Sequence, residues 1–119
     1  MDRHNIFVYG TLRSRGGNNG LLRESEFISN AVTEKEYALY VEGIPYVSKD
    51  EKVSRITGEV WSVDDNTLQR IDLLEGHPSW YVRELISVML PNLDIVKAWI
   101  YFNPNYRGRL TESGDYFNQ

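Results

Sequence analysis

Residues 68–83, LQRIDLLEGHPSWYVR, decide the fold because they predict a helix, a sharp turn and the start of a strand in close succession. Leu68, Ile71 and Leu74 follow one another at three-residue steps, so they share one face of a helix. Beyond the Gly-His-Pro turn, residues 81–90 alternate between two faces, one of which carries a Val-Ile-Val set. The stretch therefore predicts a protein that contains both helix and sheet.

Polar and flexible residues set the ends of the predicted helix. Asp64 or Asp65 offers a carboxylate to the unpaired amides at its start. Gly76 can adopt the left-handed conformation that ends a helix, and Pro78 prevents its resumption. Glu75 therefore lies in the last turn, where the helix dipole disfavours an anion by about 0.3–1 kcal/mol and raises the pKa of a carboxyl. Because the chain has 17 acidic residues, a solvated surface glutamate is the alternative to a catalytic base.

The composition argues against several kinds of partner and functional site. The 119 residues predict one domain, residues 1–119, and the net charge of −4 argues against a nucleic-acid partner. The absence of cysteine excludes disulfides, thiol nucleophiles and zinc-thiolate sites, and two histidines are too few for a histidine-rich metal site. No segment has the length of a signal peptide or a membrane span, so we expect a cytoplasmic protein without a membrane partner.

Strand-forming segments fill most of the remaining chain. Besides residues 81–90, segments rich in β-branched and aromatic residues predict strands at 5–9, 27–33, 37–41, 55–63 and 95–102. We expect a turn at 43–46, an exposed loop at 48–54 and an extended surface tail at 103–119. Connections of hairpin length and one predicted helix indicate an α+β protein whose strands are mostly antiparallel, in a curved sheet or a small closed barrel. A barrel of this size can enclose one small ligand.

The first predicted strand ends abruptly in Gly10, which lets the backbone turn and lets a ligand approach it closely. Residues 14–20, SRGGNNG, predict a loop that matches neither a dinucleotide-binding fingerprint nor a P-loop. On the strand after the turn, Tyr81 and Arg83 are expected on the same face, so both are predicted to reach one site.

Five motifs in the same order resemble the gamma-glutamylcyclotransferase-like superfamily, and most closely its gamma-glutamylamine cyclotransferase type. They are VYGTLR at 8–13, GEVW at 58–61, IDLLEG at 71–76 followed by YVR at 81–83, AWIY at 98–101, and SGDY at 113–116. The resemblance implies a small mixed, mostly antiparallel β-barrel with flanking helices and a cavity that binds a gamma-glutamyl group. It also implies an enzyme that releases 5-oxoproline without a cofactor or metal.

The resemblance also implies roles for individual residues. Glu75 becomes the general acid and base, and the backbone amides of Gly10, Thr11 and Leu12 hold the substrate. No partner beyond the small substrate is implied, and the oligomeric state and the leaving amine are left open.

Four supporting residues keep more than one interpretation each. Tyr9 packs under the glutamyl chain or in the core, and Tyr81 hydrogen-bonds the substrate or is structural. Arg13 pairs with the substrate's α-carboxylate or, as we favour, is a solvated loop residue. Arg83 pairs with Asp72 or Glu75, or braces the loop, which we favour.

Two alternatives to an enzyme remain at the level of sequence. One is a non-catalytic module that binds a small molecule in the same cavity. The other is a structural interaction protein in which the YGTLR segment is only a turn.

Overall fold

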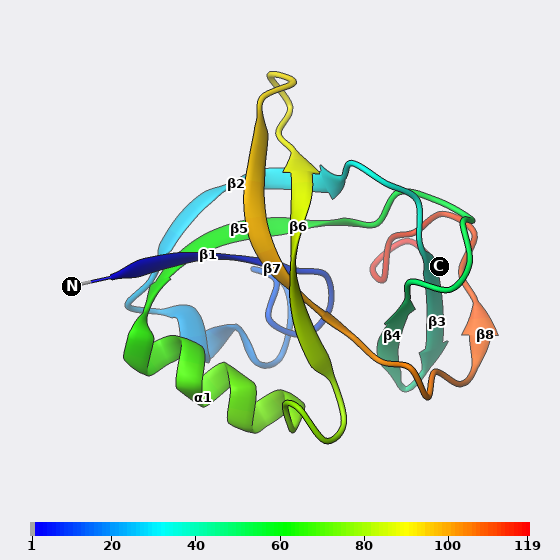
Figure 1. Cartoon of the computed structure of the whole chain (residues 1–119), viewed down its shortest axis with the longest axis horizontal. Helices are drawn as coiled ribbons and strands as arrows, with labels where there is room; N and C mark the ends of the chain where they lie inside the picture. The colour runs from blue at the N-terminus through cyan, green and yellow to red at the C-terminus, as the bar shows by residue number, and fades with distance from the viewer. Residues whose placement is uncertain (1) are drawn as a thin grey trace.

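A closed barrel of five strands forms the centre of the protein in a computed structural model that describes residues 2–119 (Figure 1). The strands neighbour one another in the order β1, β5, β2, β6, β7. Their bounds are β1 Arg3–Val8, β2 Glu26–Thr33, β5 Thr57–Asp64, β6 Val82–Met89 and β7 Ile95–Phe102. All neighbours are antiparallel except β1 and β7, which run parallel and close the barrel. The predicted mixed, mostly antiparallel barrel is therefore confirmed.

A second sheet of three strands lies beside the barrel, on the right of Figure 1. It contains β3 Ala38–Glu42, β4 Ile44–Ser48 and β8 Arg109–Leu110, with β3 in the middle. The prediction of a turn at 43–46 was wrong, because only Gly43, at φ 77°, turns the chain and β4 begins at Ile44. The loop predicted at 48–54 begins one residue later, since Ser48 still belongs to β4, and residues 49–52 are exposed as expected. The tail predicted at 103–119 likewise contributes β8, so it is part of a sheet and not only a surface wrap.

Side-chain alternation along β1 divides the core in two. Phe7 and Tyr9 belong to a cluster that includes Val60, Val88 and Ile100 of the other barrel strands. The intervening residues of β1 face the other cluster, together with the helix and the short 3-10 helix η1, Asn19–Leu22. The barrel therefore has a filled interior and an outer apolar layer under the helix.

Helix α1, Asp65–Glu75, begins and ends as the sequence predicted. The side chain of Asp64 accepts a hydrogen bond from the backbone N–H of Thr67 at 2.8 Å. Gly76 has the left-handed conformation, at φ 66°, and ends the helix. Figure 1 shows the chain turning sharply beyond this end into β6. The local sequence thus places residue 75 at the point where the chain leaves the helix.

Candidate active site

A cavity of about 230 Å³ opens where several connections meet at one side of the barrel. Its walls come from the end of β1 and the loop after it, the start of β4, the last turn of α1, residues 80–81 and β7. Gly10, Thr11 and Leu12 line it, and so does Glu75, more than sixty residues later in the chain. The structure therefore brings the predicted loop and the predicted carboxylate to one site.

Glu75 is half-buried at the end of α1, and the turn around it is closed by hydrogen bonds. Its carbonyl accepts from the backbone N–H of Tyr81 at 3.1 Å. Burial raises the pKa of the Glu75 carboxyl from its ordinary value of 4.5 to about 7. This is not the environment of a solvated surface glutamate in a frayed turn, and it provides a carboxyl that can both accept and donate a proton near neutral pH.

The loop after β1 presents backbone amides that the rest of the protein does not use. Within residues 2–119, no acceptor takes a hydrogen bond from the backbone N–H of Gly10, Thr11 or Leu12. The loop is nevertheless fixed, because the carbonyl of Thr11 accepts from the backbone N–H of Asn18 at 2.9 Å and its hydroxyl from the Asn18 side chain at 2.8 Å. Unpaired N–H groups in a fixed loop are suited to binding an anion or a carbonyl oxygen.

Gly10 also has a packing role that the sequence did not reveal. A Cβ atom at this position would lie 2.5 Å from Cγ of Pro45, on the opposite wall. A glycine is therefore required for the two walls to approach, independently of any ligand.

Tyr9 and Tyr81 line the cavity, and the hydroxyl of each donates a hydrogen bond to a backbone carbonyl. The hydroxyl of Tyr9 donates to the carbonyl of Tyr101 at 2.6 Å, and that of Tyr81 donates to the carbonyl of Pro45 at 2.8 Å. Burial, and secondarily the charge of Glu75, raises the pKa of both phenols, so they stay protonated at neutral pH. Both hydroxyls therefore stabilise the walls of the cavity.

Arg83 forms a bidentate pair with Asp72, with contacts of 2.8 and 3.2 Å. The guanidinium also lies 4.4 Å from the ring centre of Trp99. Although burial alone raises the pKa of Asp72, hydrogen bonds from Arg83 and Tyr101 hold it below its usual value. Arg83 does not line the cavity, so the expectation that Tyr81 and Arg83 both reach one site was wrong. Its pairing links α1 to β6.

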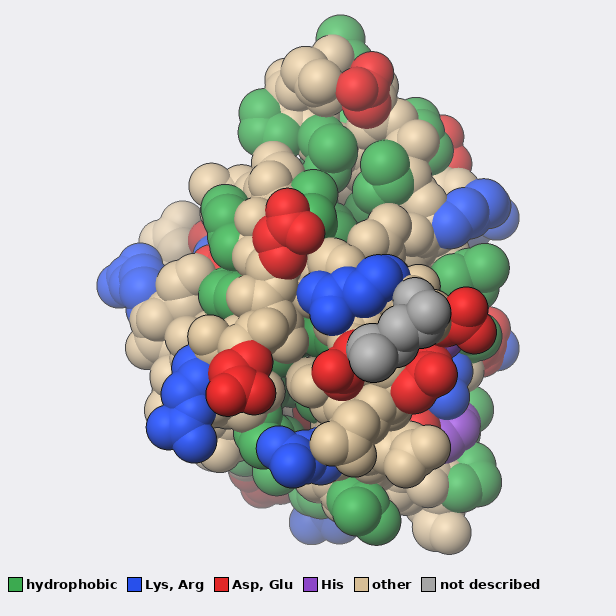
Figure 2. Space-filling model, turned by 90° about the vertical axis from the view of Figure 1, so that its left-hand side faces the viewer, with side chains coloured by type: hydrophobic (Ala, Val, Ile, Leu, Met, Phe, Trp, Pro, Cys, Tyr) green, Lys and Arg blue, Asp and Glu red, His purple; other side chains and the backbone are tan. Residues whose placement is uncertain are grey.

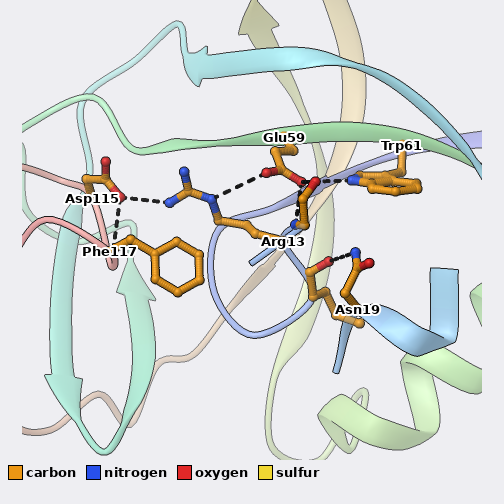
Figure 3. A network of polar contacts seen from close by, with 8 residues as sticks. Arg13, Asn19, Glu59, Trp61, Asp115 and Phe117 are labelled. Atoms are coloured by element: carbon orange, nitrogen blue, oxygen red, sulfur yellow. Dashed lines mark hydrogen bonds and ion pairs between the residues drawn. The ribbon is translucent and has the colours of Figure 1, made fainter. Parts of the chain in front are cut away.

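Arg13 is buried, with 9% of its surface exposed, so the favoured prediction of a solvated loop arginine was wrong. Figure 3 shows its guanidinium between two carboxylates. It donates to Asp115 at 2.7 Å, lies 3.9 Å from Glu59, and covers the ring of Phe117 at 4.8 Å. Arg13 lies outside the cavity lining, and it ties the loop to the carboxyl-terminal tail.

Comparison with known proteins identifies the family. The sequence profile described as "Gamma-glutamyl cyclotransferase, AIG2-like" matches residues 6–118. The chain belongs to this family. It is 49% identical over 112 residues to a putative gamma-glutamylcyclotransferase of Methanocaldococcus jannaschii, with 93% of each chain covered. It is 32% identical to gamma-glutamylaminecyclotransferase B of Danio rerio, covering 85% of this chain and 60% of that one.

Superposition on a solved structure supports the same family. The crystal structure of an AIG2-like protein from Mus musculus superposes with a TM-score of 0.85 at 27% identity, covering 97% of this chain and 90% of that chain. The resemblance and the fold class predicted from the sequence are both confirmed.

Glu59 lies in the motif GEVW at 58–61, and no role was predicted for it. It is buried and accepts hydrogen bonds from the backbone N–H and hydroxyl of Ser14, at 2.8 and 3.0 Å, and from the indole of Trp61 at 3.0 Å (Figure 3). A lone glutamate inside an apolar strand was the available signal, because a buried carboxylate requires partners. Glu59 holds the loop from the side of β5.

The cavity walls also contain residues for which no role in the site was predicted, namely Asn18, Ile44, Pro45, Leu74 and Trp80. Among residues 2–119, no three potential ligands from His, Cys, Asp and Glu lie close enough to hold a metal ion. In the same part of the chain, no helix has the length and apolar character needed to cross a membrane.

Proposed function

We propose that this protein is a gamma-glutamyl cyclotransferase that converts a gamma-glutamyl compound into 5-oxoproline and a free amine or amino acid. The observation that carries the proposal is the juxtaposition of Glu75, whose pKa is raised to about 7, with the unpaired amides of Gly10, Thr11 and Leu12 in one cavity. Membership of the family and the names of the relatives support the same reaction class.

The reaction is intramolecular. The substrate's α-amine attacks its own γ-carbonyl, a new C–N bond closes the five-membered ring, and the original amide C–N bond breaks. Holding the glutamyl chain in the folded conformation gives this attack a high effective molarity. A cavity of about 230 Å³ is below the usual size of drug-binding pockets, roughly 300–1,000 Å³, and suits a group as small as glutamyl.

Proton transfer is the task of Glu75. The substrate's α-ammonium cannot attack until it loses a proton, and the leaving nitrogen must gain one. Glu75 accepts the first proton and delivers one to the leaving nitrogen. An ordinary carboxyl, with a pKa near 4.5, is a poor donor at neutral pH, whereas burial brings Glu75 to about 7 and makes both steps accessible.

The backbone amides of the loop supply the electrostatic part of the mechanism. The tetrahedral intermediate carries negative charge on the former carbonyl oxygen, and the substrate carries an α-carboxylate. The N–H groups of Gly10, Thr11 and Leu12 are the donors available to these oxygens in the cavity. Because their loop is fixed by Asn18 and Glu59, they need no reorganisation during the reaction.

The test is 5-oxoproline release from a panel of gamma-glutamyl amino acids, gamma-glutamyl-ε-lysine and gamma-glutamyl alkylamides, followed by mass spectrometry. At least one compound should be cyclised by the wild type and not by Glu75→Gln. If the compounds bind to the wild type and none is cyclised, the protein is a non-catalytic binding module. If none binds, the cavity is not a glutamyl site.

A further inference from the structure

All four lysines of the chain line one cleft, which shares no residue with the candidate active site. They are Lys35 in the connection between β2 and β3, Lys49 and Lys52 in the connection between β4 and β5, and Lys97 on β7. Within residues 2–119, no arginine lines this cleft. On the face seen from the left of Figure 1, by contrast, basic side chains are scattered among acidic ones (Figure 2). The fold therefore gathers one type of cation from three distant segments.

The lysine cleft combines these cations with apolar surface. Its volume is about 840 Å³, within the roughly 300–1,000 Å³ of small-molecule sites. The buried rings of Tyr37 and Phe102 form its floor, with 5.1 Å between their centroids, and Nζ of Lys49 lies 5.9 Å from the ring centre of Phe102. Leu85, which is 53% exposed on β6, adds an apolar side chain to the wall. The cleft thus offers contacts to both a charged and an apolar part of a ligand.

The hydroxyl of Tyr37 is a donor that the described residues leave unused. Only 9% of this residue is exposed, and its backbone N–H donates to the carbonyl of Ser54 at 2.8 Å. Among residues 2–119, no group forms a hydrogen bond with its hydroxyl. Burial, and secondarily the charge of Glu84, raises the pKa of this phenol, so it stays protonated. Since a largely buried polar group is normally satisfied, this hydroxyl is a donor for a molecule in the cleft.

The charges of the lining favour one small anion. Lys49 pairs with Glu84, whereas the other three lysines form no ion pair within residues 2–119. Glu34 and Glu36 are exposed and flank Lys35 on the same connection. With four lysines against three glutamates, the lining has a formal charge of +1 in a chain of net charge −4. The glutamates would repel an extended polyanion, but the lysines can still surround a single anionic group.

Phosphate is the anionic group that these donors fit. An ammonium group on a flexible stem approaches a phosphate as a point charge, and lysines from separate segments can do so from different sides. A phosphate monoester has three strong acceptor oxygens, which match the three lysines without an ion pair and the Tyr37 hydroxyl. We propose that the lysine cleft is a second ligand site, which binds a small organic phosphate with an aromatic or apolar group. The phosphate lies among the lysines, and the apolar group covers Leu85 and the aromatic floor. This site goes beyond the proposed function and does not depend on it.

Phenyl phosphate is the probe, and benzoate and inorganic phosphate are its matched controls. Each is titrated at pH 8 and low salt into the ¹⁵N-labelled full chain, where amide shifts report both affinity and location. Phenyl phosphate should bind at least about tenfold more tightly than either control, and added salt should weaken it. Its shifts should centre on residues 34–37, 84–87 and 97. Equal affinities, or shifts centred on residues 10–12, would overturn the proposal.

Variants test the donors one at a time. Lys52→Gln and Lys97→Gln should each weaken phenyl phosphate by about three- to tenfold. Arg23→Gln removes the same charge at an exposed position outside the cleft and should leave the affinity unchanged. Tyr37→Phe should weaken binding about tenfold without lowering Tm, because the hydroxyl has no partner among residues 2–119. Equal losses in the lysine variants and in Arg23→Gln, or full affinity in Tyr37→Phe, would refute the site.

The same titration on Glu75→Gln separates the two sites. Phenyl phosphate should bind this variant as tightly as the wild type, because Glu75 lies in the other cavity. Tighter binding to the variant would place the phosphate beside Glu75 and overturn its assignment to the lysine cleft.

Discussion

Replacement of Glu75 by glutamine tests the link between burial and catalysis. Glutamine keeps the size and hydrogen-bonding reach of the side chain but exchanges no proton at neutral pH. Turnover should fall by roughly 10²–10⁴, the usual contribution of a positioned acid or base. Substrate binding should fall far less, because the amides of Gly10, Thr11 and Leu12 remain in place.

The same substitution should stabilise the protein in a pH-dependent way. Below about pH 4.5 the Glu75 carboxyl is protonated in both folded and unfolded chains, so its burial has no linked cost. As the pH rises from 4.5 to 7, the unfolded chain releases the proton and the folded chain retains it, which lowers the free energy of unfolding. Above about 7 both states are ionised and the loss is complete. A pKa raised from 4.5 to about 7 corresponds to about 3 kcal/mol.

Thermal unfolding of wild type and Glu75→Gln at pH 4.5 and pH 8 measures this effect. The advantage of the variant should grow between the two pH values by roughly 10 °C in Tm. Glu112→Gln, at an exposed carboxylate outside the cavity, is the matched control. A Tm difference between wild type and Glu75→Gln that is the same at both pH values would refute the raised pKa, and unchanged turnover would remove Glu75 from the mechanism.

Three further substitutions test two walls of the cavity and the contact between its loop and the carboxyl-terminal tail. Gly10→Ala should lower stability by roughly 1–3 kcal/mol, because its Cβ meets Pro45 at 2.5 Å, and an unchanged urea midpoint would contradict this packing. Tyr81→Phe removes the buried hydrogen bond to the Pro45 carbonyl; it should cost about 1 kcal/mol and change kcat/KM only a few-fold, whereas a hundredfold loss would show that the hydroxyl acts on the substrate. Asp115→Asn leaves buried Arg13 without its closest carboxylate and should raise KM more than it lowers kcat, and unchanged kinetics would mean that the tail does not position the loop.

The helix and its end were predictable because their signals are local. The apolar spacing of Leu68 and Ile71, the cap at Asp64 and the left-handed Gly76 act within a few residues of one another. These interactions do not depend on the rest of the fold, so they place Glu75 at the helix end from sequence alone. The burial of Glu75 was not predictable in the same way, because the opposite walls come from β1 and the start of β4.

The misjudged segments depend on distant partners. Strand β4 begins with Ile44 and Pro45 beside a glycine, a composition that favours a turn, and its pairing with β3 overrides that preference. Arg13 meets Asp115 across 102 positions of sequence, so no local pattern distinguishes it from a solvated arginine. The tail also reaches the β3–β4 turn, since the hydroxyl of Tyr116 donates to the carbonyl of Gly43 at 3.0 Å. Residues 113–119 therefore contact two segments that carry cavity walls.

The dependence of kcat/KM on pH, measured for 5-oxoproline release from one cyclised gamma-glutamyl compound between pH 4 and 9, tests the central claim most directly. Free Glu75 must be ionised to accept the ammonium proton, so kcat/KM should rise with pH through an ionisation near 7. It should fall again at higher pH, as the substrate's own amine loses its proton. An acid limb near 4.5, the value of an ordinary glutamate, would contradict a proton shuttle tuned by burial in this cavity.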